Sequence, residues 1–178
     1  KQHAYFDFDN HAYVWDAMRK LKGRGRSSLL LLARPLTQTY AQEMLRALTE
    51  AGKDLSMTVR FIERPIEKIQ GAESPAAFAA AIAQELKRAP HIDAVIGASI
   101  DAGLTAAQAV EKIKGVVGDT IDVWTKELQP FLANFRPDIL TTFENASPAG
   151  TFLARAVQNA IAQPSRPPLQ KLVGPEDI

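Results

Sequence analysis

Residues 94–115, AVIGASIDAGLTAAQAVEKIKG, contain an apolar stretch, a short turn and a helical pattern in succession. The stretch from Ala94 to Ala98 is apolar on both faces, as in a strand buried inside a parallel sheet. From Asp101 onward, apolar residues recur at the spacing of one helix face, and Gly115 follows as a helix stop. These residues therefore predict a strand, a turn and a helix, which together form the repeating unit of an α/β fold.

The same alternation extends in both directions from this unit. Strands are predicted at Ala4–Phe8, Ser27–Ala33, Met57–Ile62, His91–Ala98, Thr120–Trp124, Ile139–Phe143 and Leu169–Val173. Helical spacing fills most of the intervals, and the last helix is predicted at Pro148–Ala162. This order predicts a doubly wound, mostly parallel sheet with helices on both faces, a three-layer α/β/α arrangement.

Composition limits the classes of function. The chain has 178 residues, enough for one domain or two closely joined lobes. Its net charge of +1 gives no overall field to attract nucleic acid or an anionic membrane. Cysteine is absent and the three histidines are scattered, so we expect no disulfide, no metal site and no cofactor. No apolar run approaches the ~20 residues of a membrane span, and the first residues do not resemble a signal peptide, so a soluble protein is expected.

The motifs of the common enzyme classes are missing from the sequence. There is no Walker A loop, no G-x-G-x-x-G, no G-x-S-x-G and no H-E-x-x-H. An enzyme on a doubly wound sheet remains an alternative, and it would depend on Asp9, Asp101 or Glu127 as the acid or base. The sequence favours a binding protein over a catalyst.

Candidate ligand contacts follow from the fold, because open α/β sheets bind ligands beyond the carboxyl ends of their strands. The candidates at or near these ends are Asp9, Asn10, Tyr40, Arg64, Asp101, Trp124 and Glu127. All but Glu127 have a structural alternative. Asp9, Asn10 and Asp101 could cap helices, Tyr40 and Trp124 could belong to the core, and Arg64 could be solvated.

Five segments, taken in order, resemble the lactose-repressor family of bacterial transcription regulators. They are FDFDNHA with LKGRGRSSLLLL (6–12 and 21–32), RALTEAG (46–52), residues 94–115, VGDTIDV (117–123) and RPDILTTFENASPAG (136–150). The resemblance implies a type I periplasmic-binding-protein-like fold that binds a small polar effector, such as a sugar. It also implies that Asp101, by its spacing from Gly115, is an effector contact. The regulator would be a cytoplasmic homodimer that reads operator DNA through a helix-turn-helix headpiece absent from this sequence.

The sequence departs from the family pattern at several contact positions. Where the family places an arginine early in the second helix, the nearest residues are Tyr40, Glu43 and Met44. Ile100 replaces the asparagine before the key aspartate, and Thr125-Lys126-Glu127 replaces a Gly-aromatic-Asp turn, with Glu127 in the place of its Asp. The identity of the effector therefore does not transfer from the family.

The resemblance also implies a domain organisation for a chain truncated at its N-terminus. Residues 9–124 would form the C-terminal lobe, 125–145 a remnant of the N-terminal lobe, and 146–178 the final helix and strand. The chain would cross between lobes near Phe8, Trp124 and Thr142–Asn145. The segment between the last two crossings would be rearranged, paired with another chain or more mobile than the rest.

The leading alternative is a periplasmic solute-binding protein of a sugar importer, which would share the fold. The sequence upstream of Lys1 would distinguish the two classes of protein. A helix-turn-helix there indicates a regulator, and a signal peptide indicates a transport receptor.

Overall fold

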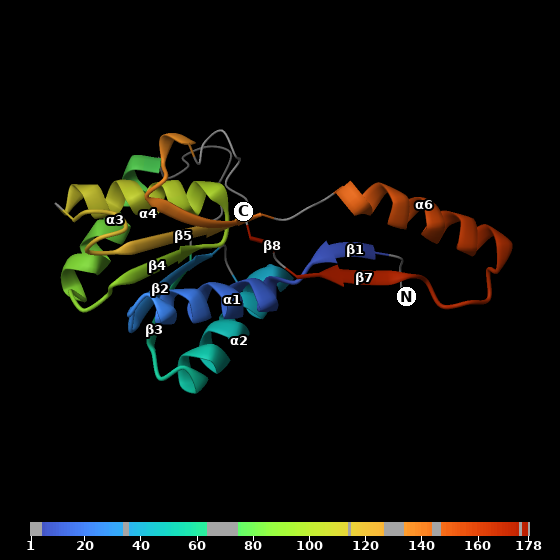
Figure 1. The fold of residues 1–178 in the computed structure, drawn as a ribbon, viewed down its shortest axis with the longest axis horizontal. Helices are drawn as coiled ribbons and strands as arrows, with labels where there is room; N and C mark the ends of the chain where they lie inside the picture. The colour runs from blue at the N-terminus through green and yellow to red at the C-terminus, as the bar shows by residue number, and fades with distance from the viewer. Residues whose placement is uncertain are drawn as a thin grey trace.

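The strands and helices of the protein alternate along most of the chain (Figure 1). The computed structural model describes residues 5–33, 36–63, 75–113, 115–126, 134–143, 147–174 and 176–177. The strands are β1 (Tyr5–Phe8), β2 (Ser28–Ala33), β3 (Thr58–Glu63), β4 (Ala94–Gly97), β5 (Asp122–Lys126), β6 (Ile139–Phe143), β7 (Gln170–Val173) and β8 (Glu176–Asp177). The helices are α1 (Asn10–Gly23), α2 (Thr39–Asp54), α3 (Pro75–Arg88), α4 (Ile100–Lys112) and α6 (Ser147–Ala162). The predicted alternation is confirmed.

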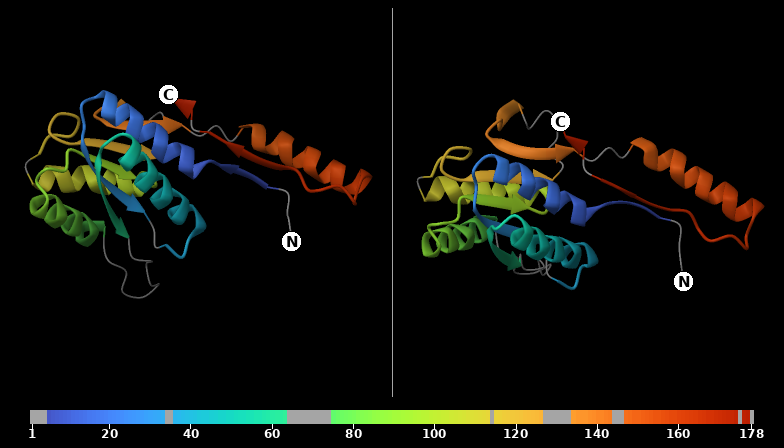
Figure 2. Two further views of the ribbon diagram at one scale, coloured as in Figure 1. Left: turned by 90° about the horizontal axis from the view of Figure 1, so that it is seen from below. Right: turned by 60° about the horizontal axis from the view of Figure 1, so that its bottom comes forward.

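Within the described residues, six strands form the main sheet, in the order β3-β2-β4-β5-β6-β8. All neighbouring strands are parallel except β6 and β8, which pair antiparallel. Helices α1 and α2 cover one face of the sheet and α3 and α4 the other (Figure 1 and Figure 2). We call this assembly the main unit. It confirms the predicted doubly wound, mostly parallel sheet.

The strand order reverses direction at β2, and this reversal determines where a ligand site is expected. From β2 the chain passes to β3 on one side and then to β4 on the other. Helices that follow strands on opposite sides of such a reversal leave a crevice at the carboxyl edge of the sheet. A ligand site is therefore expected at the carboxyl ends of β2 and β4.

Strand β2 divides the described core into two clusters. Its successive leucines are all fully buried and point alternately to opposite faces of the sheet. Leu29 and Leu31 pack with α1 and α2, whereas Leu30 and Leu32 pack with α3 and α4. The four-leucine run is therefore a strand that needs a helical layer on each face.

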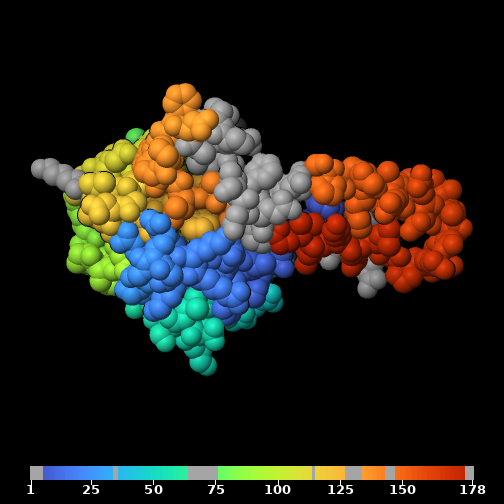
Figure 3. Space-filling view, in the orientation of Figure 1, coloured from blue at the N-terminus to red at the C-terminus, as the bar shows by residue number. Residues whose placement is uncertain are grey.

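The remaining described elements, β1, β7 and α6, form a separate unit that we call the arm. Strands β1 and β7 make a parallel pair of their own. Helix α6 packs on this pair, with the rings of Phe6 and Phe152 5.8 Å apart. The arm extends away from the carboxyl edge of the main sheet (Figure 1 and Figure 3).

The predicted domain boundaries need one correction. Residues 139–143 were expected in a remnant of the N-terminal lobe, but β6 pairs with β5 in the main sheet, from Val123 with Ile139 to Lys126 with Thr142. The open edge of β5 supplies hydrogen-bond partners for this β-branched stretch, which therefore belongs to the main sheet. Among the described elements, the chain passes between main unit and arm after β1, after β6 and after β7. Residues 127–133 lie outside the described part of the chain.

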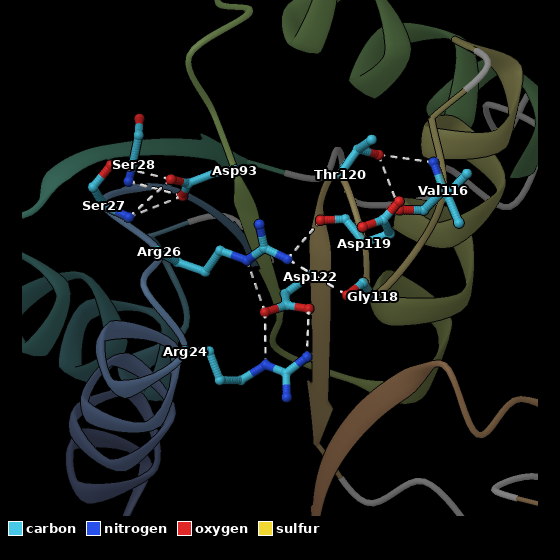
Figure 4. Close-up of polar contacts among 10 residues, drawn as sticks. All are labelled: Arg24, Arg26, Ser27, Ser28, Asp93, Val116, Gly118, Asp119, Thr120 and Asp122. Carbon is cyan, nitrogen blue, oxygen red and sulfur yellow. Dashed lines mark hydrogen bonds and ion pairs between the residues drawn. The ribbon is translucent and has the colours of Figure 1, made fainter.

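A buried carboxylate holds the amino edge of the main sheet together (Figure 4). The side chain of Asp122, at the start of β5, is 0% exposed. Its oxygens accept hydrogen bonds from Arg24 at 2.8 and 3.1 Å and from Arg26 at 2.9 Å. Burial opposes ionisation of this carboxyl, but the hydrogen bonds from the two arginines outweigh it and lower the pKa of Asp122. The ion pairs thus fix the turn between α1 and β2 against β5.

We expect Asp122→Asn to lower the free energy of unfolding at neutral pH by about 2–4 kcal/mol, because Arg26 loses its buried counter-charge while the half-exposed Arg24 is partly compensated by water. The lowered pKa sets the pH dependence. The stabilisation is complete above the unfolded-state pKa of about 3.9 and is lost as pH falls through the lower folded-state pKa. Urea titrations in progressively acidic buffers measure both effects.

The exposed Asp119 provides a matched control at the same edge of the sheet. Asp119→Asn should leave the free energy of unfolding within about 0.5 kcal/mol of the wild-type value. If Asp122→Asn is as stable as this control at neutral pH, the carboxylate does not stabilise the edge.

Candidate functional site

At the carboxyl edge, helix α4 approaches the sheet more closely than a side chain would allow. A Cβ atom added at Gly97, at the end of β4, would lie 2.5 Å from the backbone nitrogen of Gly103. A Cβ at Gly103 would collide with the side chain of Thr125 on β5. The Thr125 hydroxyl donates a 2.8 Å hydrogen bond to the carbonyl of Ser99, in the turn before α4. Two glycines and one threonine therefore hold the first turn of α4 against β4 and β5.

Asp101 lies in that first turn, and its side chain is exposed. Capping was the structural alternative for this aspartate, but the cap of α4 is Ser99, whose hydroxyl accepts from the backbone N–H of Ala102 at 3.3 Å. Asp101 is therefore not the cap of α4, although its charge in the first turn favours the helix dipole. Its carboxylate lies beyond the end of β4, at the edge where ligands of such sheets bind.

Asp9 has the structural role that was its alternative. Its carboxylate accepts a 2.8 Å hydrogen bond from the backbone N–H of Ala12 and caps α1. One oxygen of Asp9 is therefore committed to the fold.

Asn10 belongs to a polar cluster that joins four elements. It is the first residue of α1 and is only 5% exposed. Its side-chain oxygen accepts a 2.9 Å hydrogen bond from the ammonium of Lys126, at the end of β5. Its amide nitrogen donates to the Phe8 carbonyl at 3.2 Å and lies 3.5 Å from a carboxylate oxygen of Glu43 on α2. The cluster lies at the junction of the main unit and the arm.

Of the two aromatic candidates, Trp124 lies in the core and Tyr40 packs against it. Trp124 is 4% exposed and packs between the sheet and helices α1 and α2. Its ring presents no face to a ligand, which corrects the expectation of a stacking surface there. Tyr40 is partly buried and packs against the same cluster. Arg64 and Glu127 lie outside the described residues.

Sequence reasoning missed Lys126 and Glu43 as members of the cluster. The predicted strand ended at Trp124, whereas β5 continues to Lys126, so the residue at the true strand end was not singled out. The sequence did contain a signal for Lys126. This residue lies two positions after Trp124, and residues two apart in a strand point to the same side of the sheet. Glu43 carried no comparable signal, since only the packing of α2 on α1 brings it to Asn10.

Two further findings concern metal binding and membrane-spanning helices. No group of three or more histidine or carboxylate residues among them could hold a metal ion. No described helix has both the length and the apolar character needed to cross a bilayer.

Comparison with known proteins places the fold. No family model and no curated protein matches the sequence. Among solved structures, a LacI-family regulatory protein from Chloroflexus aggregans matches with a TM-score of 0.83 and 16% identity, over 100% of this chain and 63% of that chain. A complex of the transcriptional regulator CelR with cellobiose matches with a TM-score of 0.79 and 21% identity, over 99% of this chain and 53% of that chain.

A third similar structure is the Lac repressor bound to ONPG, with a TM-score of 0.78 and 16% identity, over 99% of this chain and 52% of that chain. These identities are low, so the matches establish the fold. They confirm the predicted periplasmic-binding-protein-like class. The chain spans 52% to 63% of the length of these structures.

The close approach of α4 to the sheet can be tested with Gly103→Ala. We expect it to lower the free energy of unfolding by about 1–3 kcal/mol, because the added methyl group forces α4 away from Thr125. Gly150, a helical glycine of α6 with no atom within 4 Å of an added Cβ, is the matched control. Gly150→Ala should be neutral or stabilising by up to about 1 kcal/mol. Equal effects of the two substitutions in urea titrations would contradict the packing described for α4.

Proposed function

We propose that this chain is the C-terminal part of the effector-binding domain of a lactose-repressor-type transcription regulator. The observation that supports it best is the match of nearly the whole chain to solved regulators, over only part of their length. The five ordered sequence segments support the same family. In this proposal the arm is the portion of the N-terminal lobe that the sequence contains, and the helix-turn-helix headpiece lies outside the sequence.

The effector we propose is a small polar molecule, such as a sugar or sugar derivative. Asp101 is the central contact, because its exposed carboxylate at the carboxyl edge can accept hydrogen bonds from ligand hydroxyls. Asn10 lies at the same edge, and Asp9, Tyr40, Arg64 and Glu127 remain proposed contacts. Similar structures whose names include cellobiose and ONPG support this class of ligand.

The proposed action is regulatory rather than catalytic. A ligand bound between the two lobes favours the closed arrangement, and the change in lobe angle alters the spacing of two DNA-reading headpieces. Since each headpiece reads one half-site, the regulator acts as a homodimer in the cytoplasm. No residue of the chain is assigned a catalytic role.

The class of protein is tested by the coding sequence upstream of Lys1. A helix-turn-helix followed by a lobe of α/β pattern is the expected result. A signal peptide there would overturn the proposal in favour of a solute-binding protein of a sugar importer.

The effector site is tested by calorimetry of the complete gene product against a panel of mono- and disaccharides and nucleosides. We expect Asp101→Ala to weaken binding of the effector at least about tenfold, as the loss of hydrogen bonds to a charged group does. Asp119→Ala, at the opposite edge of the sheet, is the control and should bind as the wild type does. Unchanged affinity in Asp101→Ala would remove Asp101 from the site.

A further inference from the structure

Lys126 lies where the main unit meets the arm. It is the last residue of β5, and its side chain is partly buried. Its ammonium donates a 2.9 Å hydrogen bond to the side-chain oxygen of Asn10. This bond joins residues 116 positions apart in the sequence. Lys126 therefore connects the central part of the main sheet to the start of the first helix.

Through Asn10 the contact reaches the arm. The amide nitrogen of Asn10 donates to the carbonyl of Phe8, the last residue of β1, at 3.2 Å. Because Asn10 is 5% exposed, water has little access to replace either bond. The orientation of the Asn10 amide is thus set by a cation from the main unit on one side and a backbone carbonyl from the arm on the other.

The same ammonium also lies near two aromatic rings. Its nitrogen is 5.9 Å from the ring centroid of Phe8 and 5.9 Å from that of Tyr13, within the range of cation–π attraction. Tyr13 belongs to α1, and its hydroxyl donates a 2.9 Å hydrogen bond to the carbonyl of Gly97 at the end of β4. One ring thus comes from the arm, and the other is anchored in the main unit.

A restraint on the position of Phe8 also restrains the rest of the arm. The backbone N–H of Asp9 donates to the carbonyl of Val173, the last residue of β7, at 2.8 Å. Strand β1 pairs with β7 along its length, and Phe6 contacts Phe152 of α6. A restraint at the end of β1 therefore acts on the orientation of the whole arm.

We propose that Lys126 is a positioning residue that fixes the angle between the arm and the main unit. Its contacts with Asn10 and Phe8 form a latch, a term we use for these three residues. The inference rests on the proposed function for its biological consequence, since lobe closure would have to keep or break the latch. The latch itself is defined without a ligand and is tested without one.

The test measures the distance between the two units. Because the chain contains no cysteine, spin labels can be attached at Gln84→Cys on α3 and Gln158→Cys on α6, both exposed positions. Pulsed electron paramagnetic resonance then gives the distribution of distances between arm and main unit. In Lys126→Met, which keeps the apolar stem, we expect the ratio of latched to unlatched molecules to fall about tenfold and the distribution to broaden.

Two further variants separate latching from general stability. Lys20→Met is the matched control, because Lys20 also lies over an aromatic ring, that of Trp124 at 5.8 Å, but within the main unit. It should leave the distribution unchanged. Lys126→Arg restores a cation and a donor, and should restore the narrow distribution.

A distribution in Lys126→Met that matches the wild type would overturn the proposal. So would equal broadening in Lys20→Met, since the effect would then be one of stability. Should Lys126→Met fail to fold, Phe8→Leu provides a second test that removes only the arm ring, and it should broaden the distribution to a smaller extent. Because no effector is present in these measurements, the latch can fail while the ligand-binding proposal stands, and the reverse also holds.

Discussion

The alternating burial of the β2 leucines is the constraint on which the rest of the structure depends. Leu29 and Leu31 need one helical layer, Leu30 and Leu32 need another, and β2 can satisfy both only inside a sheet. The chain therefore has to place helices on both faces, and it does so by passing to β3 on one side of β2 and β4 on the other. The reversal of strand order beside the carboxyl ends of β2 and β4 is a consequence of this packing.

The two edges of the main sheet differ in their chemistry. At the amino edge, polar groups are matched to one another. Asp122 is enclosed by two arginines, and Asp93 accepts from the backbone N–H groups of Ser27 and Ser28. At the carboxyl edge, Asp101 is exposed in the first turn of α4, and the Asn10 cluster lies at the junction with the arm. The amino edge is thus held by matched charges, whereas the carboxyl edge carries an exposed carboxylate.

Local patterns were sufficient to predict the strands, the helices and the doubly wound class, because the periodicity of buried residues is a property of neighbours in sequence. They were insufficient wherever distant segments meet. The pairing of β6 with β5 was missed because a β-branched strand pairs equally well with any open edge. Lys126 was missed because its partner is 116 residues away. For Trp124 the sequence left both a ligand contact and a core position open, because an aromatic residue at a strand end has the same sequence pattern whether it faces solvent or a helix.

Helix α6 has a consequence for how the protein behaves in solution. Among its described side chains only Ala156 is buried, and Leu153, Val157 and Ile161, spaced four apart, are 44%, 59% and 76% exposed. Such a stripe attracts other apolar surfaces, including copies of itself. Four of the six large hydrophobic side chains exposed in the described part of the chain therefore belong to the arm, and association through it should grow with protein concentration and salt even where the fold is unchanged.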